Sequence, residues 1–216
     1  AVKLSNDTAI GLKVGKKLGL TSHGMLGYAI IASGTVREMV NIFSRYLNTR
    51  TPLLRVDIES SESILKLELH ECYALDEIKI PFIESAIYTI YNLLLQITQN
   101  VAPIKKISFP YPKPKYWKTY SECFDYPIEF DQSVASISLN QLEIDQPLLM
   151  SDLQSLEQAK VICEKELVKL QTDESLEVKI RNFQDSAEEL MMILMLELGQ
   201  GISSKIKRVS MMMPSS

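Results

Sequence analysis

The stretch that decides the fold is 54-LRVDIESSESILKLEL-69, in which apolar and polar residues alternate on both sides of a short polar turn. The apolar residues at every second position are Leu54, Val56, Ile58, Leu65, Leu67 and Leu69. Successive side chains of a strand point to opposite faces of a sheet, so each half predicts a strand with one buried face. Residues 60–63 form the turn, and we expect an antiparallel hairpin.

On both sides of the hairpin lie segments whose apolar residues have the spacing of a helix. Thr35 with Glu38 has the pattern of a capping box and precedes an apolar stripe, which predicts a helix over residues 35–47. Pro81 precedes apolar residues spaced four, three, four and three apart up to residue 97. This spacing predicts a long core helix that Asn100 and Pro103 terminate.

The remaining elements complete an alternating pattern. Before the hairpin we expect a helix over residues 7–17 and a buried strand over 27-GYAIIA-32, because that run is continuously apolar. After the long helix we expect strand 104–109, helix 115–124, strands 128–130 and 135–139, and a helix capped by Ser151 with Gln154 that runs to residue 170. A further helix is expected over residues 174–184, and residues 190–198 are almost wholly apolar.

Both halves of the chain then have the order strand, helix, strand, strand, helix. We therefore expect an α+β fold of two pseudo-repeated βαββ units, with a mixed or antiparallel sheet covered by helices and followed by C-terminal helices. A ligand cleft between the two units is the expected consequence.

Composition and charge exclude several classes of protein. The 216 residues are 46% hydrophobic and 23% charged, which indicates one or at most two globular domains. The net charge is −4, whereas a free-standing nucleic-acid-binding domain usually carries a basic excess, so any DNA contact is expected to be local. Three widely spaced cysteines make a poor disulfide framework. With neither a signal peptide nor a membrane-spanning apolar run, we expect a soluble protein of the reducing cytoplasm.

Motifs for catalysis, nucleotides or metals are not found in the sequence. His23 lies in a turn, where a capping or loop hydrogen bond is its ordinary role. His70 and Cys72 share a strand face, but the spacing offers no two further ligands for zinc. The acidic residues around the hairpin are explained by the turn and by the solvent face of the strands. We therefore expect no catalytic residue, no metal and no cofactor.

Lysines and aromatic residues mix in 111-YPKPKYWKTY-120. This composition can stack bases and neutralise phosphates. The alternative, which we favour, is that Trp117 and Tyr120 face the core while the lysines stay in water. Aromatic residues here can also line a pocket for a small molecule.

Two sets of short motifs follow one another along the chain. The first half contributes Gly11-Leu12, Gly15, 22-SHGMLGYA-29 and 33-SGTVRE-38. The second half contributes Tyr116, Tyr120, Phe124, 127-PIEF-130, Leu142, Pro147-Leu148 and 162-ICE-164. In type and order over roughly residues 8–170, these motifs resemble the N-terminal, arabinose-binding-like effector domain of AraC/XylS-type bacterial transcriptional regulators.

The resemblance implies a non-catalytic domain that senses a small-molecule effector, forms a homodimer, or both. It also implies that promoter DNA is bound through a C-terminal domain with two helix-turn-helix motifs, which we do not recognise in this chain. Residues 1–172 are accordingly expected to be the sensing and dimerisation domain. Residues 173–216 are expected to be a helical linker or the start of an incomplete DNA-binding domain, so we predict no specific operator binding by this chain and no membrane association.

For the ligand pocket we predict Tyr28, Tyr116, Trp117 and Phe130, aromatic residues at element entries where the two halves can meet, with His23 as a further candidate. We expect the effector to favour one of two states, with the helices after Asp152 carrying the change. Two alternatives stay open. One is a small-molecule-binding or catalytic α+β protein of another family, and the other is an interaction module that uses helix 156–170.

Overall fold

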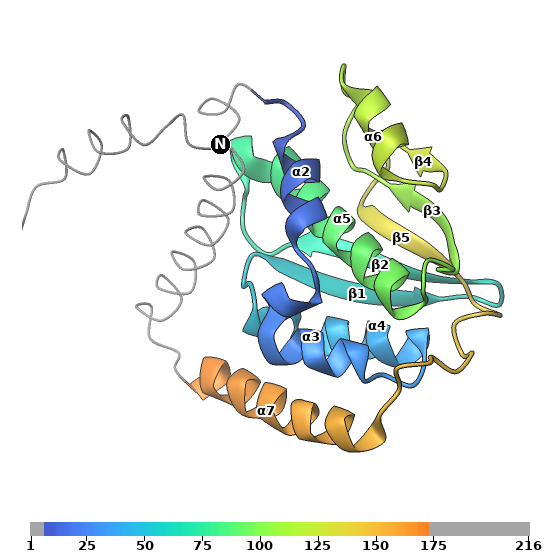
Figure 1. The fold of residues 1–216 in the computed structure, drawn as a ribbon. Helices are drawn as coiled ribbons and strands as arrows, with labels where there is room; N and C mark the ends of the chain where they lie inside the picture. Colours follow the sequence, from blue (N-terminus) through green and yellow to red (C-terminus); the bar gives the residue numbers. More distant parts are fainter. Residues whose placement is uncertain (1–6, 173–216) are drawn as a thin grey trace, which may run out of the picture.

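The computed structural model describes residues 7–172 of the chain, which are drawn in Figure 1. In chain order the elements are α2 (Ile10–Lys17), the 3-10 turn η1 (Leu20–His23), α3 (Gly24–Ile31), α4 (Val36–Tyr46), η2 (Leu47–Thr49), β1 (Leu54–Ser60), β2 (Ile64–Glu71), η3 (Asp76–Ile78), α5 (Lys79–Ile97), β3 (Ile104–Ser108), α6 (Trp117–Cys123), β4 (Ile128–Glu129), β5 (Ala135–Asn140) and α7 (Leu153–Thr172). The α+β class expected from the sequence is confirmed.

One mixed sheet of five strands organises the fold, with the strand order β1-β2-β5-β3-β4. The hairpin of β1 and β2 is antiparallel, and its register places Val56 opposite Leu69. Strand β5 pairs antiparallel with both β2 and β3, whereas β4 runs parallel to β3. The apolar residues of β1 and β2 therefore share one face of the sheet with those of β5, as the alternation predicts.

Helix α5 lies across this apolar face (Figure 1). The five residues of its predicted stripe are each at most 4% exposed: Ile83, Ile87, Ile90, Leu94 and Ile97. The helix ends where Gln99 and Asn100 take positive φ angles of 53° and 67°, which reverses the chain before Pro103. Residues Asp76–Ile97 are long and apolar enough to cross a membrane, but 67% of the apolar window is buried inside the fold, as in a core helix.

The predicted strand over residues 27–32 is wrong, because this segment lies in helix α3. A short, continuously apolar run fits a buried helix as well as a buried strand. Helix α3 is packed on several sides, since it contacts η1, α4 and α7, and Leu26 and Ile30 are each at most 1% exposed. The first half of the chain consequently lacks its leading strand, and the two halves are not repeats of one βαββ unit.

The other predicted elements are confirmed, with small shifts at their ends. Thr35 caps α4 by accepting a hydrogen bond from the Glu38 amide, while the Glu38 carboxylate accepts from Gly34. Helix α7 is capped by Asp152, which accepts from the Ser155 amide, and not by the predicted Ser151. The helix predicted at 174–184 and the apolar segment 190–198 lie outside the described residues.

Two glycines allow α2 to pack directly on the backbone of α5. A Cβ atom at Gly11 would lie 2.3 Å from the carbonyl oxygen of Pro81, and one at Gly15 would lie 2.6 Å from that of Ser85. Real side chains do not approach backbone atoms this closely. The spacing Gly-x-x-x-Gly thus places the first helix against the core helix without an intervening side chain.

A buried carboxyl group, Glu84, lies beside this contact in α5 and is 0% exposed. Its Oε1 accepts hydrogen bonds from the hydroxyl groups of Tyr116, at 2.8 Å, and Tyr120. Burial disfavours the carboxylate more strongly than these donors stabilise it, and it raises the pKa of Glu84 to about 7. This cluster joins α5 to α6, which otherwise lies at the edge of the sheet.

We predict that Gly15→Ala lowers the free energy of unfolding by about 2 kcal/mol. The added methyl group overpacks a close backbone contact, which costs about 3 kcal/mol, and the gain of roughly 1 kcal/mol that alanine brings to a helix interior offsets part of this cost. Urea unfolding measures the change. Gly19→Ala is the matched control, since a Cβ there meets only the Gln96 side chain at 3.8 Å, and equal stabilities of the two variants would contradict the packing described.

We predict that Glu84 makes the fold more stable in acid. Its folded pKa of about 7 lies above the ordinary 4.5, so its contribution is full below pH 4.5 and is lost as the pH rises through 7. Between pH 5 and 8 the wild type should lose about 2–3 kcal/mol more than Glu84→Gln. Unfolding curves at both pH values test this, with exposed Glu122→Gln as the control that keeps the wild-type slope.

Candidate functional site

A cavity of about 120 Å³ lies between the apolar face of the sheet, α5 and α4. Its wall is mostly carbon, and the apolar residues that line it are Leu18, Phe43, Leu47, Leu54, Val56, Leu69, Phe82, Ala86 and Ile90. The polar residues are Ser22, His23, Arg50, Thr51, Ser85 and Thr89. Small-molecule sites are usually concave and apolar with a few placed polar groups, and this cavity has that character.

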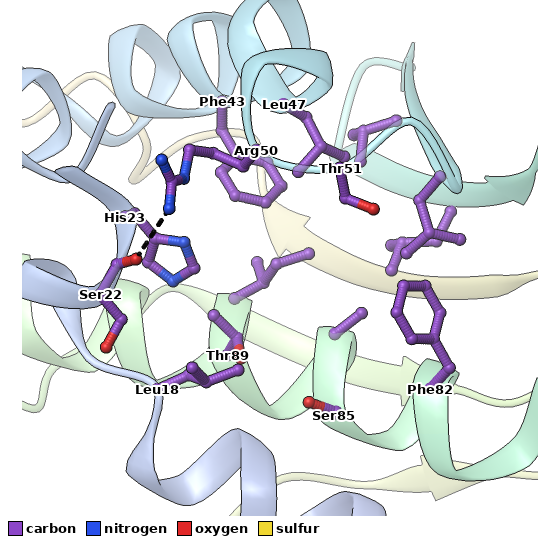
Figure 2. A pocket seen from close by; sticks show the side chains of 15 residues that line it. Leu18, Ser22, His23, Phe43, Leu47, Arg50, Thr51, Phe82, Ser85 and Thr89 are labelled. Carbon is purple, nitrogen blue, oxygen red and sulfur yellow. Dashed lines mark hydrogen bonds between the residues drawn. The ribbon is translucent and has the colours of Figure 1, made fainter. Parts of the chain in front are cut away.

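The polar groups gather mainly at one end of the cavity. Figure 2 shows Ser22, His23 and Arg50 side by side there, with Phe82 at the opposite end. Arg50 donates a hydrogen bond from Nη2 to the backbone oxygen of Ser22, at 3.2 Å. Arg50 is the single formally charged side chain among the described residues that line the cavity.

His23 is neutral at physiological pH. Burial disfavours the imidazolium form, and the nearby positive charge of Arg50 adds to this, so the pKa of His23 falls to about 4. Its Nε2 atom is buried and has no hydrogen-bond partner among the described residues. The His23 ring is therefore uncharged, and its Nε2 atom is available to hydrogen-bond with a group in the cavity.

Local backbone geometry brings His23 and Arg50 together. His23 ends η1, and Gly24 follows with a φ of +54°, a conformation that glycine adopts without strain. Arg50 follows η2, where its amide donates to the Leu47 carbonyl at 2.8 Å. A Cβ at Gly24 would lie 3.6 Å from Arg50 Nη1, so the two turns are in contact.

Helix α5 supplies a third polar group. Thr89 is 4% exposed, and its Oγ1 has no hydrogen-bond partner among the described residues. A helical threonine often donates to a carbonyl one turn earlier. Here Thr89 faces the cavity instead, and Ser85 lies one helical turn before it on the same wall.

The structure separates the five residues that we predicted for the pocket. His23 lines the cavity, whereas Tyr28 lies on α3 with 58% of its surface exposed. Tyr116 stacks on Tyr120 and binds Glu84. Trp117 and Phe130 share a separate depression of about 460 Å³ beside α6.

That depression is lined partly by the exposed residues Lys113, Ser121 and Asp125, unlike the cavity in the core. Tyr120 faces the core as predicted, with 0% exposure. The same prediction is wrong for Trp117, which is 39% exposed and lies under Lys113, whose Nζ is 3.6 Å from the ring centroid. Of the seven residues of α6, only Tyr120 is buried.

The other histidine takes part in an ion-pair arrangement on the polar face of the sheet. His70 Nε2 lies 3.3 Å from Glu68 and 3.6 Å from Asp57, while Cys72 is exposed. Within residues 7–172, no group of three His, Cys, Asp or Glu side chains is arranged to hold a metal ion.

Arg50 and Thr89 were missed by sequence reasoning. Arg50 precedes the Thr51-Pro52 helix stop and has no neighbour in sequence that suggests a site. Thr89 lies within an apolar helix, where a single threonine is common. Both become candidates only when four separate segments are brought together in space.

Comparisons with known proteins identify the family. The family model described as "Arabinose-binding domain of AraC transcription regulator, N-term" matches residues 1–148. The ornithine utilization regulator of Pseudomonas aeruginosa is 22% identical over 181 residues, which cover 84% of this chain and 53% of that protein. An uncharacterised HTH-type transcriptional regulator of Mycobacterium tuberculosis is 38% identical over 61 residues, 28% of this chain and 17% of that protein.

A solved structure supports the fold. The crystal structure of the transcriptional regulator CdpR from Pseudomonas aeruginosa matches with a TM-score of 0.63 at 12% identity, over 86% of this chain and 61% of that chain. The chain thus spans about half the length of the ornithine utilization regulator and under two thirds of CdpR. From the extent of the family match, this chain belongs to the family of N-terminal, arabinose-binding-type effector-sensing domains of AraC transcription regulators.

Proposed function

We propose that the cavity between the sheet, α4 and α5 is the site at which this domain binds its effector. The observation that carries the proposal is a carbon-lined cavity inside the core whose polar end holds Arg50 and His23. A cavity of this kind, formed by several elements at once, changes the packing of each of them when it is filled. A sensing domain needs a site with that property.

We further propose how the domain fits in an intact regulator. The match covers only 53% of the ornithine utilization regulator, and other relatives are named as HTH-type transcriptional regulators, which supports DNA binding by a C-terminal helix-turn-helix domain. Residues 1–172 would then sense and dimerise, and residues 173–216 would form the linker or the start of the DNA-binding part. As a regulator domain it would be non-catalytic and would act in the bacterial cytoplasm.

The compounds in the relatives' names are not supported as effectors of this domain. The family description names arabinose and one relative's name mentions ornithine. The described lining residues include no acidic side chain to pair with an ammonium group, and most of the wall is carbon. These features favour a more apolar effector.

Helix α4 provides a path from the cavity to α7. Phe43 and Leu47, in α4 and the turn after it, line the cavity. On α4 the Tyr46 hydroxyl donates to Glu164 of α7 at 2.9 Å, and Arg45 pairs with the same carboxylate at 3.0 Å. Figure 1 shows α7 beside α3 and α4, as the last helix of the described residues. A shift of α4 on effector binding would therefore move the helix that leads out of the domain.

We propose that α7 also forms the homodimer interface. Its inner residues Leu156, Ala159 and Cys163 are buried, whereas Val161 and Val168 are 52% and 47% exposed. The two valines are seven residues apart and thus lie on one face of α7. We propose that a second copy of the chain covers this face.

We predict that a screen of amino acids, hydroxy acids, sugars and fatty acids finds a compound that stabilises the domain. Binding to the folded state adds about 2.7 kcal/mol at a hundredfold excess over the dissociation constant. Ala86→Leu should abolish the thermal shift, because the larger side chain fills the cavity. Gln96→Leu, at an exposed position of the same helix, is the control that keeps the shift. A shift that survives Ala86→Leu would exclude the cavity as the site.

A second prediction concerns the path through α4. In an intact regulator, Tyr46→Phe combined with Glu164→Gln should leave effector affinity within about threefold. It should reduce the effector-dependent change in operator affinity by about two- to fivefold, the worth of a partly exposed charged contact. Fluorescence anisotropy with operator DNA measures both quantities.

The control for this prediction is Arg55→Gln, which breaks an exposed ion pair with Asp57 on β1. It should change neither effector affinity nor coupling. Unchanged coupling in the α4–α7 double variant would rule out this route of communication.

A further inference from the structure

The polar end of the cavity contains hydrogen-bonding atoms that a ligand would satisfy. His23 Nε2 and Thr89 Oγ1 are both buried, and neither has a partner among the described residues. Buried polar groups in folded proteins are nearly always paired, and leaving one unpaired is unfavourable. Two such atoms facing one cavity point to a bound molecule with at least one polar group.

The charge at this end favours an anionic group. Arg50 carries a planar, positively charged guanidinium group, which matches a carboxylate geometrically. Neutral His23 can donate from Nε2 to a carboxylate oxygen without adding a charge of its own. The described lining residues include no aspartate or glutamate, so an ammonium group on the ligand would lie beside Arg50 without a counter-charge.

The rest of the cavity sets the size and polarity of the ligand body. The walls are formed by aliphatic side chains and by the rings of Phe43 and Phe82. One water molecule occupies roughly 10–15 Å³ when a cavity volume is defined in this way. The cavity of about 120 Å³ therefore has room for about eight to twelve non-hydrogen atoms. A polyhydroxylated molecule of that size would leave most of its hydroxyl groups against carbon.

We propose that the effector is a monocarboxylate of about six to ten carbons in all, whose carboxylate lies between Arg50 and His23 and whose remaining carbons are apolar. The hydrocarbon part then runs along α5 past Thr89 towards Phe82. This inference rests on the proposed function, because it assigns a chemical class to the same cavity.

Calorimetric titration of the 216-residue chain with matched compounds tests the class. Hexanoate and benzoate are the probes, and 1-hexanol and hexylamine are counterparts of hexanoate with a neutral or a cationic head. We expect both carboxylates to bind at least tenfold more tightly than the alcohol, with the amine weaker still. Equal or tighter binding of 1-hexanol or hexylamine would overturn the carboxylate assignment.

Variants identify the residues that recognise the head group. Arg50→Gln should weaken hexanoate binding at least tenfold and leave 1-hexanol binding within threefold, whereas Arg55→Gln, at an exposed position on β1, should change neither. His23→Gln is a second test that does not depend on the folding of the Arg50 variant, and it should weaken hexanoate binding about threefold or more. Undiminished hexanoate binding by both variants would overturn the proposal.

The experiments distinguish a wrong chemical class for the effector from a wrong binding site. If a sugar or an amino acid binds, the carboxylates do not, and Ala86→Leu abolishes that binding, then the cavity is the effector site but the chemical class is wrong. If no compound in the wider screen binds, or if binding is indifferent to Ala86→Leu, then the proposed function of the cavity itself is wrong.

Discussion

The packing of α5 on the apolar face of the sheet is the interaction on which the other features depend. The alternating residues of β1 and β2 offer one continuous apolar face, and α5 is the single long helix that covers it among the described residues. Burial of about ten large apolar side chains at roughly 1.5–3 kcal/mol each far exceeds any single polar contact in the domain. The position of α5 therefore fixes the position of whatever packs on it.

Three features follow from that position. Helix α2 is held against the α5 backbone through Gly11 and Gly15, and α6 is held through the hydrogen bonds of Glu84. The cavity lies between α5, α4 and the sheet, with Thr89 on one wall and Phe43 on another. One wall of the candidate site is thus the helix that stabilises the core. Another wall, α4, also contacts α7.

The parts of the fold with a strong period were predictable from sequence. Apolar residues recur at every second position in the hairpin and at helical spacing over the nineteen residues of α5. In both elements the local pattern and the tertiary packing therefore favour the same structure. The segment 27–32 has no period, because all of its residues are apolar or small, and its helical state is decided by contacts with η1, α4 and α7. That one segment is enough to remove the apparent internal repeat.

The candidate site was less predictable for a related reason. His23 was selected as a residue, but its partner Arg50 is 27 positions away and Thr89 a further 39, and no local pattern connects them. The aromatic residues Tyr116, Trp117 and Phe130 were conspicuous in sequence, yet they serve the Glu84 cluster and the depression beside α6. Aromatic residues are conspicuous in a sequence. The position of a cavity, in contrast, depends on how helices and strands pack in space.

Hydrogen–deuterium exchange with and without saturating hexanoate tests most directly the claim that cavity occupancy reaches α7. The account predicts slower amide exchange in α4, in α5 around residues 82–90, and in α7 around Glu164, with exchange in α6 unchanged. Protection confined to α6 and β4, or slower exchange in α5 with none in α4 and α7, would contradict it.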